Sequence, residues 1–209
     1  MDLKNSLLLY VIPDKEIGLG RNLVLQAEQA LSGGATAIQL RAKSISSYEL
    51  YEIGLRLREV TKKFDALFIV NDRLDIALAT SADGVHLGNN DLPVPAARKI
   101  AGDKFIIGRS VVSVRDAQTA EKDGADYLGA ASIFPTTSKI DVKIIGLEKL
   151  KEICMNVRIP VVGIGGINEN NALDVINSGA SGVSIISAIF VKDDIKEAAQ
   201  EIKRRIKGE

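Results

Sequence analysis

The chain alternates eight short apolar, β-branched runs with segments whose apolar residues recur every three or four positions. The short runs fit buried strands, and the segments between them fit amphipathic helices. No Pro- or Ser-rich linker interrupts this alternation, which is typical of parallel βα units in a single domain over residues 1–209. The expected strands are residues 7–12, 37–41, 67–71, 84–88, 105–110, 127–132, 161–166 and 182–187.

A weak internal repeat indicates how these units are arranged. Similar tripeptides precede each even-numbered strand, namely GAT at 34–36, SAD at 81–83, GAD at 124–126 and GAS at 179–181. Their spacing of 43 to 55 residues is too irregular for a solenoid, but it suits four double units that close a barrel. We therefore predict an α/β fold, a parallel eight-stranded (β/α)8 TIM barrel. An open doubly wound sheet is the alternative, although the first βα turn lacks the G-x-G-x-x-G pattern.

Polar residues and glycines mark the expected ends of the helices. Ser46 and Glu49 form a capping-box pattern, in which each side chain can bond the other's backbone N–H. Further helix starts are expected at Ser113, Asn168 and Asp193. Helices are expected to end near Gly33, Gly124 and Gly179.

Composition excludes several classes of function. The 27 basic and 27 acidic residues cancel, so no net field attracts nucleic acid or an anionic membrane. The apolar run near the N-terminus is too short for a membrane span, which predicts a cytoplasmic protein. Cys154 and His86 are the only residues of their types, which argues against a disulfide, a multi-Cys zinc site and a Cys–His or Ser–His catalytic pair. We expect His86 to be a hydrogen-bonded barrel residue and Cys154 to pack as a small hydrophobe.

The active site of such a barrel lies at the carboxyl ends of its strands, so the polar residues there are the candidates. Asp72 and Asp91 follow neighbouring strands and could bind Mg2+ together, although a helix cap for Asp72 and a turn for Asp91 explain them equally simply. The remaining strand-end candidates are Gln39, Arg41, Lys43, Asn71, Ser110, Thr136, Thr137, Ser138, Lys139, Gly165, Gly166 and Ser187. Their cations, hydroxyls and glycines are suited to phosphate, although a solvated rim and a plain polar loop remain open.

Taken in order, these segments resemble the thiamine-phosphate synthase (thiamine phosphate pyrophosphorylase) family over about residues 7 to 190. The matching motifs are LYVI at 9–12, QLRAK at 39–43, IVNDR at 69–73, DGVHLG at 83–88 with Asp91, IGRS at 107–110, FPT at 134–136 with Lys139, GIGGI at 163–167 and SAI at 187–189. The resemblance implies a transferase that joins 4-amino-2-methyl-5-(diphosphooxymethyl)pyrimidine to a thiazole phosphate and releases pyrophosphate. Its partners would be these two small phosphorylated molecules, with Mg2+ as cofactor.

The resemblance also assigns roles to residues. Arg41, Ser110 and Lys139 would be catalytic, and Asp72 and Asp91 would hold Mg2+. The pyrimidine pyrophosphate would be bound by Gln39, Arg41, Lys43, Asn71, Ser110 and Lys139. The thiazole phosphate would be bound by Thr136, Thr137, Ser138, Gly166, Ile186 and Ser187.

Two alternatives share the barrel. The sibling thiazole tautomerases are isomerases with an acid/base histidine two residues beyond the serine of the fifth strand, where this chain has Val112. A non-catalytic barrel that binds a thiamine precursor is the other alternative. Such a protein would have no need for two metal carboxylates, whereas this chain keeps both.

Overall fold

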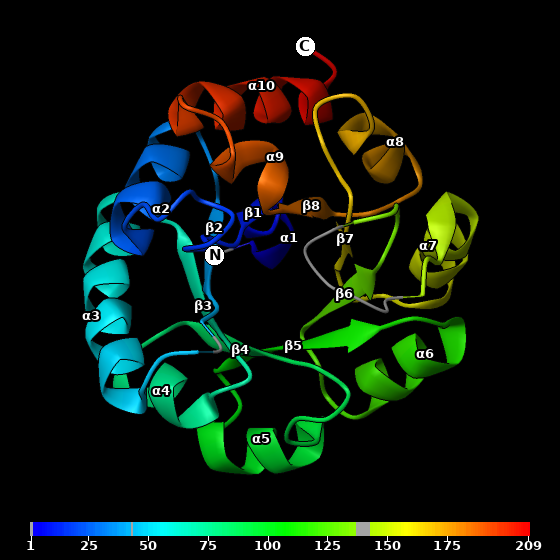
Figure 1. The fold of residues 1–209 in the computed structure, drawn as a ribbon. Helices are drawn as coiled ribbons and strands as arrows, with labels where there is room; N and C mark the ends of the chain where they lie inside the picture. Colours follow the sequence, from blue (N-terminus) through cyan, green and yellow to red (C-terminus); the bar gives the residue numbers. More distant parts are fainter. Residues whose placement is uncertain (1, 43, 137–142) are drawn as a thin grey trace.

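Eight parallel strands form the centre of the molecule (Figure 1), in a computed structural model that describes residues 2–42, 44–136 and 143–209. Each strand pairs with the next along the chain, and β1 pairs with β8, which closes the barrel. The strands are β1 (Leu9–Val11), β2 (Ala37–Leu40), β3 (Leu67–Asn71), β4 (Gly84–Leu87), β5 (Ile106–Val111), β6 (Tyr127–Ala131), β7 (Val161–Ile164) and β8 (Gly182–Ile185). The predicted parallel (β/α)8 barrel is therefore confirmed.

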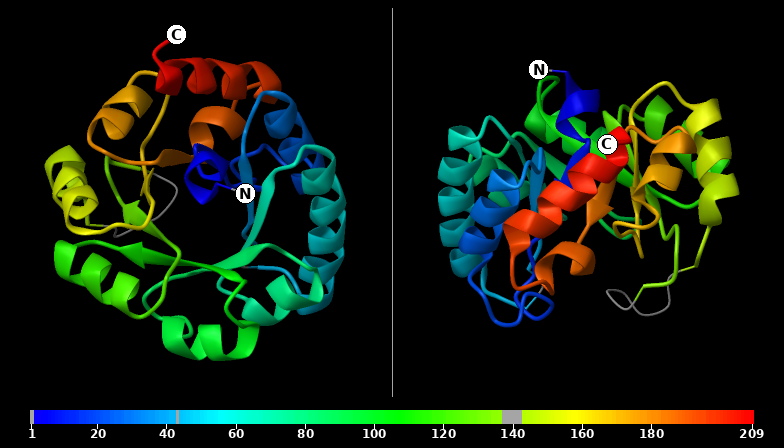
Figure 2. Two further views of the ribbon diagram at one scale, coloured as in Figure 1. Left: turned by 180° about the vertical axis from the view of Figure 1, so that it is seen from behind. Right: turned by 90° about the horizontal axis from the view of Figure 1, so that it is seen from above.

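Helices surround the barrel, and one short helix covers an end of it. The outer helices are α2 (Leu23–Ser32), α3 (Ser47–Lys63), α4 (Leu74–Ala79), α5 (Val94–Ala101), α6 (Val114–Lys122), α7 (Gly146–Asn156), α8 (Ala172–Asn177) and α10 (Ile195–Lys207). The helix α1 (Leu3–Ser6) lies across the amino end of the barrel, where Leu3 packs against interior residues. Figure 2 shows α1 on the opposite side of the barrel from α9 (Ser187–Phe190), which follows β8. No helix in the described ranges is long and apolar enough to cross a membrane.

The expected strand ends agree with the structure to within two residues, and two helix starts are wrong. Ser46 forms the expected capping box, and the Ser113 hydroxyl accepts a hydrogen bond from the Asp116 N–H. Helix α8 begins at Ala172 rather than after Asn168, whose side chain instead accepts from the N–H of Asn170 within a tight turn. Helix α10 is capped by Asp194, one residue later than the expected Asp193.

Alternation along the strands divides the apolar residues between two cores. Residues that face outward pack under the helices, as Val70 and Leu128 do in the larger cluster. Inward-facing residues fill the barrel in a smaller cluster, comprising Leu7, Tyr10, Ala37, Leu67, Ile69, Tyr127 and Val162. A barrel packed in this way is a solid core, so ligands can bind only at its ends.

The internal repeat has a structural role at the amino end of the barrel. The side chain of Asp83 accepts a hydrogen bond from the N–H of Phe68 at 2.8 Å, and Asp126 accepts from Ile107 at 2.7 Å. Thr36 does the same for Leu9 at 3.0 Å. In each case the backbone N–H of the repeat residue also donates to the carbonyl of the same partner. Each repeat residue thus ties the strand that it precedes to the odd-numbered strand before it.

Two of the repeat residues, Asp83 and Asp126, also form ion pairs with arginines. Arg58 forms an ion pair with Asp83 at 2.8 Å, and Arg98 forms one with Asp126 at 2.6 Å. Arg98 also donates to the backbone carbonyls of Gly102 and Gly124, so it holds the loops that precede β5 and β6. The last repeat tripeptide differs, because Ser181 contributes only its backbone N–H, which donates to Val161 at 2.8 Å.

We predict that Asp126→Ala destabilises the fold. The substitution leaves the buried N–H of Ile107 without its acceptor and removes the partly exposed ion pair with Arg98. Together these losses should lower the free energy of unfolding by about 2–3 kcal/mol, most of it from the unsatisfied N–H. Urea denaturation followed by circular dichroism measures this change. Glu152→Gln, which removes the exposed pair with Lys149, is the control and should cost less than about 0.5 kcal/mol.

Candidate functional site

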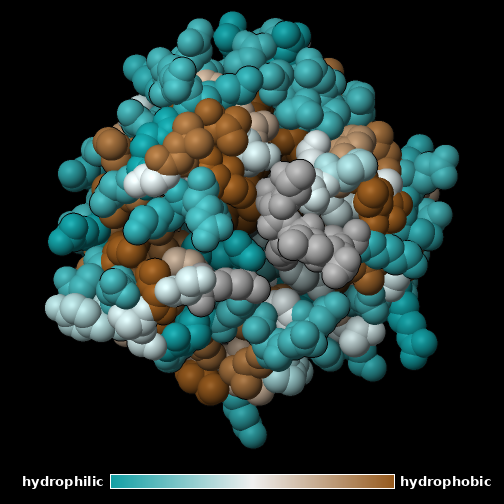
Figure 3. Space-filling model, in the orientation of Figure 1, coloured by the Kyte–Doolittle hydropathy of each residue, from teal (hydrophilic) through white to brown (hydrophobic). Residues whose placement is uncertain are grey.

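The expected polar residues meet at the carboxyl end of the barrel. Gln39, Asn71 and Ser110 lie on β2, β3 and β5 at positions that alternate with outward-facing residues. Arg41 directly follows β2, and Asp72 directly follows β3. This end of the molecule faces the viewer in Figure 1. Figure 3 shows the same face, with hydrophilic residues along its outer edge and hydrophobic residues exposed farther in.

Arg41 provides a cation at this end. It is half-buried, and it forms no hydrogen bond or ion pair with any other residue that the structure describes. A guanidinium that follows a barrel strand and has no carboxylate partner among the described residues is suited to an anionic ligand. Four further candidates, Lys43, Thr137, Ser138 and Lys139, lie outside the described residues.

The ends of β6, β7 and β8 enclose a small cavity of about 50 Å3. Four residues that the resemblance assigns to the thiazole phosphate line it, namely Thr136, Gly166, Ile186 and Ser187. Its other walls include Ser132 and Ile164, and the peptide bond between Ala131 and Ser132 in this wall is cis. These four expected residues thus surround one space at the strand ends.

Two consecutive glycines shape the wall that β7 contributes. Gly165 and Gly166 both have positive φ, of 99° and 65°, which favours glycine. A Cβ at Gly165 would lie 2.0 Å from the Ser132 hydroxyl, and one at Gly166 would lie 2.4 Å from the Pro135 carbonyl. Within the described chain, the N–H groups of both glycines donate no hydrogen bond. The close approach of the β6 loop to this turn therefore requires glycine and leaves two backbone donors for a ligand.

Sequence reasoning missed one residue of this cavity, Ser184. It lies on β8, it is 2% exposed, and its hydroxyl has no hydrogen-bond partner among the residues that the structure describes although it lines the cavity. A buried hydroxyl without a partner is energetically unfavourable in the unliganded protein, which points to a ligand contact. The sequence signal was weak, since Ser184 sits inside an apolar strand three residues before the recognised SAI motif.

The two candidate metal-binding aspartates are both bonded to the strand β4 or the residue after it, Asp72 through its backbone and Asp91 through its carboxylate. The N–H of Asp72 donates to the carbonyl of His86 on β4 at 2.9 Å. One carboxylate oxygen of Asp91 accepts from the N–H of Gly88, the residue after β4, at 2.6 Å. Asp72 has a φ of 62°, a conformation that is unfavourable for aspartate and that occurs often at functional sites.

The structure also bears on the two alternative roles, a helix cap for Asp72 and a turn for Asp91. Asp72 is no helix cap, because α4 begins at Leu74 and no side chain caps it. The turn role holds for one oxygen of Asp91, which leaves the other for a ligand. The described residues contain no cluster of three or more His, Cys, Asp or Glu side chains. Two carboxylates suffice for Mg2+, which takes its other ligands from water and phosphate, so the donor set fits that ion.

A chain of hydrogen bonds crosses the barrel interior below the site. Gln39 donates to the Tyr10 hydroxyl at 2.6 Å, and the hydroxyls of Tyr10 and Tyr127 lie 3.1 Å apart. The two ring nitrogens of His86 lie 3.0 Å from the Tyr127 hydroxyl and 2.9 Å from that of Ser110. Burial raises the pKa of both tyrosines, so both phenols stay protonated. His86 is therefore the hydrogen-bonded barrel residue that we predicted.

Two other features are unrelated to the strand ends. Cys154 on α7 packs partly against the core, as expected, and burial raises the pKa of its thiol to about 11.

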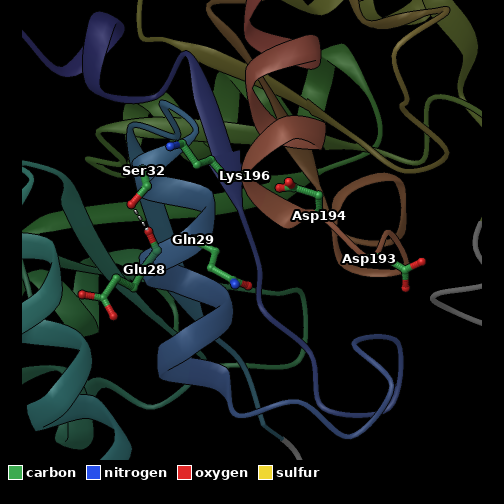
Figure 4. A pocket seen from close by; sticks show the side chains of 6 residues that line it. All are labelled: Glu28, Gln29, Ser32, Asp193, Asp194 and Lys196. Atoms are coloured by element: carbon green, nitrogen blue, oxygen red, sulfur yellow. Dashed lines mark hydrogen bonds between the residues drawn. The ribbon is translucent and has the colours of Figure 1, made fainter.

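An open groove of about 470 Å3 lies on the outside of the barrel between α2 and the start of α10 (Figure 4). Glu28, Asp193 and Asp194 give this groove three carboxylates against the one ammonium of Lys196, so it does not suit an anion.

Known proteins resemble the chain over nearly its full length. The sequence model of the family described as thiamine monophosphate synthase matches residues 9–189. Thiamine-phosphate synthases from Pyrococcus furiosus and Coprothermobacter proteolyticus are 50% and 51% identical to it, each alignment covering 98% of this chain and 97% of the relative. A solved structure of thiamine phosphate pyrophosphorylase from Pyrococcus furiosus superimposes with a TM-score of 0.93 at 48% identity, covering 99% of this chain and 98% of that one.

We predict that Ser184→Ala stabilises the protein in the absence of ligand. The substitution removes a buried hydroxyl that has no partner, so the free energy of unfolding should rise by roughly 1 kcal/mol. Thermal unfolding of the unliganded protein measures it. Thr80→Val serves as the matched control, because the buried Thr80 hydroxyl donates to the Ile76 carbonyl and its loss should be destabilising. A loss of stability in Ser184→Ala would mean that this hydroxyl has a partner in solution.

Proposed function

The chain belongs to the thiamine monophosphate synthase family, and on this premise we propose that it is a thiamine-phosphate synthase. It joins the pyrimidine of 4-amino-2-methyl-5-(diphosphooxymethyl)pyrimidine to a thiazole phosphate. The C–O bond to the diphosphate breaks, and its electron pair leaves with pyrophosphate. The thiazole ring nitrogen supplies the electron pair of the new C–N bond, and the product is thiamine phosphate. The observation that carries this proposal is the convergence of cation, carboxylates and hydroxyls at one barrel end.

The main requirement of this reaction is to stabilise the negative charge that grows on the departing diphosphate. Arg41 is suited to this because its guanidinium has no partner among the described residues and can donate two parallel hydrogen bonds to phosphate oxygens. Ser110 adds a hydroxyl from β5, and Asn71 adds an amide from β3. Lys43 and Lys139, which lie outside the described residues, would complete the set. Preorganised donors of this kind act where the charge develops, so they favour the transition state.

We assign Asp72 and Asp91 to Mg2+. Asp72 is bonded to β4 through its backbone and Asp91 to Gly88 through its carboxylate, at the same end of the barrel as the residues that would bind the diphosphate. When bound there, the ion would neutralise charge on the pyrophosphate oxygens. The strained backbone of Asp72 and the hydrogen bond from Gly88 to Asp91 would hold the two carboxylates in place for it.

The cavity between β6, β7 and β8 would take the phosphate of the thiazole substrate. Its donors are the hydroxyl of Ser187, the backbone N–H groups at Gly165 and Gly166, and the buried hydroxyl of Ser184. A cavity of about 50 Å3 holds a phosphate group rather than a whole substrate, so the thiazole ring would lie toward the barrel axis. This arrangement would place the ring nitrogen near the pyrimidine carbon, and holding two reactants together removes much of the entropic barrier.

The two alternatives have less support. A thiazole tautomerase would need an acid/base residue two positions beyond Ser110, and Val112 cannot transfer a proton. A non-catalytic barrel is a poor match to relatives that are named as synthases over nearly the whole chain. The proposed reaction needs no protein nucleophile, which agrees with the protonated Cys154 thiol away from the strand ends. A cytoplasmic location and the lack of a nucleic-acid partner stay predictions.

The proposal is tested by turnover. Purified protein is mixed with the pyrimidine diphosphate, the thiazole phosphate and Mg2+, and thiamine phosphate and pyrophosphate are measured together. We expect the two products in equal amounts, with none when either substrate is omitted. Binding of both substrates without any product would leave only the non-catalytic alternative.

We predict that Asp91→Asn raises the Mg2+ concentration needed for half-maximal turnover by about tenfold or more, because a neutral amide is a weaker ligand for a hard cation. The amide oxygen can still accept from Gly88, so the turn and the fold should persist. Turnover is measured across a Mg2+ titration. Asp103→Asn is the control, since Asp103 is exposed and precedes β5 at the amino end of the barrel. An unchanged titration for Asp91→Asn would rule Asp91 out as a ligand.

A further inference from the structure

The hydrogen-bond chain inside the barrel connects two residues of the proposed pyrimidine site. Gln39 lies at one end of the chain and Ser110 at the other, and three buried residues link them across the barrel. The three are Tyr10 and Tyr127, which are fully buried, and His86, which is 4% exposed. None of them was assigned to the site from the sequence.

The donors in this chain can be ordered from one end to the other. Tyr10 accepts from Gln39, so its own proton can go only to the Tyr127 hydroxyl, the other described partner of Tyr10. Tyr127 must then donate to Nδ1 of His86, which makes Nδ1 an acceptor. A neutral imidazole with Nδ1 as acceptor carries its proton on Nε2, and that proton is donated to the Ser110 hydroxyl oxygen. With the amide nitrogen of Gln39 toward Tyr10, any other order leaves a fully buried phenol proton without an acceptor.

This order determines what the two ends present to a ligand. The Ser110 oxygen already accepts from His86, so its own proton points elsewhere and is available for a phosphate oxygen. The amide nitrogen of Gln39 is engaged with Tyr10, and its Oε1 accepts from no residue in the described ranges. That oxygen is available to accept from an amino group such as the one on the pyrimidine. If the donors ran in the opposite order, Ser110 would present an acceptor and Gln39 would present a donor to the ligand.

Glycines on neighbouring strands hold the central residues in place. A Cβ at Gly108 would lie 2.2 Å from the Tyr127 ring, and one at Gly129 would lie 2.9 Å from the His86 ring. Tyr127 also packs against Tyr10 and His86, with ring centroids 6.1 Å and 5.5 Å away. The backbone at Gly108 therefore lies close to the Tyr127 ring and that at Gly129 close to the His86 ring, and this close packing restricts their movement.

We propose that Tyr10, Tyr127 and His86 are positioning residues that fix the hydrogen-bond polarity of the pyrimidine site. They make Ser110 a donor toward the diphosphate and Gln39 an acceptor toward the exocyclic amine. The kinetic part rests on the proposed function, whereas the order of protons can be measured without any substrate.

Nitrogen-15 NMR of the unliganded protein tests the order of protons. His86 is the only histidine in the chain, so untagged protein labelled at histidine gives one pair of ring-nitrogen signals. We expect the neutral tautomer with its proton on Nε2. A proton on Nδ1 would mean that the chain runs the other way, and a doubly protonated ring would break it; either result overturns the proposal.

Two tyrosine variants separate positioning from a general loss of packing. Tyr127→Phe removes the donor to Nδ1, so the His86 signals should move toward a mixture of tautomers. Tyr10→Phe removes a hydroxyl that is equally buried but leaves the hydrogen bonds of His86 with Tyr127 and Ser110 in place, so the Nε2 tautomer should persist. The same spectrum in Tyr127→Phe as in the wild type, or the same change in both variants, would overturn the proposal.

Kinetics test the link to the site. Tyr127→Phe should lower kcat/KM for the pyrimidine diphosphate about tenfold, the size expected for one misoriented hydrogen bond to a charged group. The KM for the thiazole phosphate should stay within about twofold, because its cavity lies at β6, β7 and β8. Thr61→Val is the control, since it removes a buried hydroxyl on α3 outside the barrel. Equal losses for both substrates, or wild-type kinetics in Tyr127→Phe, would reject the link.

Discussion

Polar groups at the amino end of the barrel tie three pairs of neighbouring strands together. There Thr36, Asp83 and Asp126 each use a side chain and a backbone N–H to bind the start of the neighbouring odd-numbered strand. A parallel sheet has no tight hairpins to fix its register, so such bridges set how far each strand advances toward the other end. The relative heights of Gln39, Asn71 and Ser110 follow from the registers of β2 to β5, and the Asp83 bridge acts on the register between β3 and β4.

The barrel interior changes from apolar to polar along its axis. Leu7, Ala37 and Leu67 fill the amino end, and the hydrogen-bonded residues from Tyr10 to His86 occupy the middle. Buried polar groups are tolerated only when they are satisfied, and this chain satisfies each of its buried phenols from within the protein. The buried hydroxyl of Ser184 has no partner among the described residues, and it lies against the cavity where a ligand can supply the missing partner.

The sequence predicts the local features of this protein better than the long-range ones. The strands and the Ser46 and Ser113 caps depend on neighbours a few residues away, so periodicity and residue type reveal them. The contact between Tyr10 and Tyr127 joins residues 117 positions apart, and only the folded barrel brings them together. The caps at Asn168 and Asp193 were wrong because several neighbouring Asn and Asp residues can each serve as caps, and backbone geometry chooses among them. The unusual φ of Asp72 likewise has no counterpart in residue type.

The four double βα units differ in the bonds that join their two strands at the amino end of the barrel. The first three are each tied by a side chain as well as by the backbone, whereas Ser181 ties β8 to β7 through its N–H alone. Local opening of a protein takes place where fewest interactions must break. Among these four pairs, β7 and β8 therefore have the fewest described bonds from the repeat residue that must break on local opening. The same two strands form walls of the cavity around Ser184 at the other end of the barrel, so the cavity proposed for a phosphate adjoins this pair.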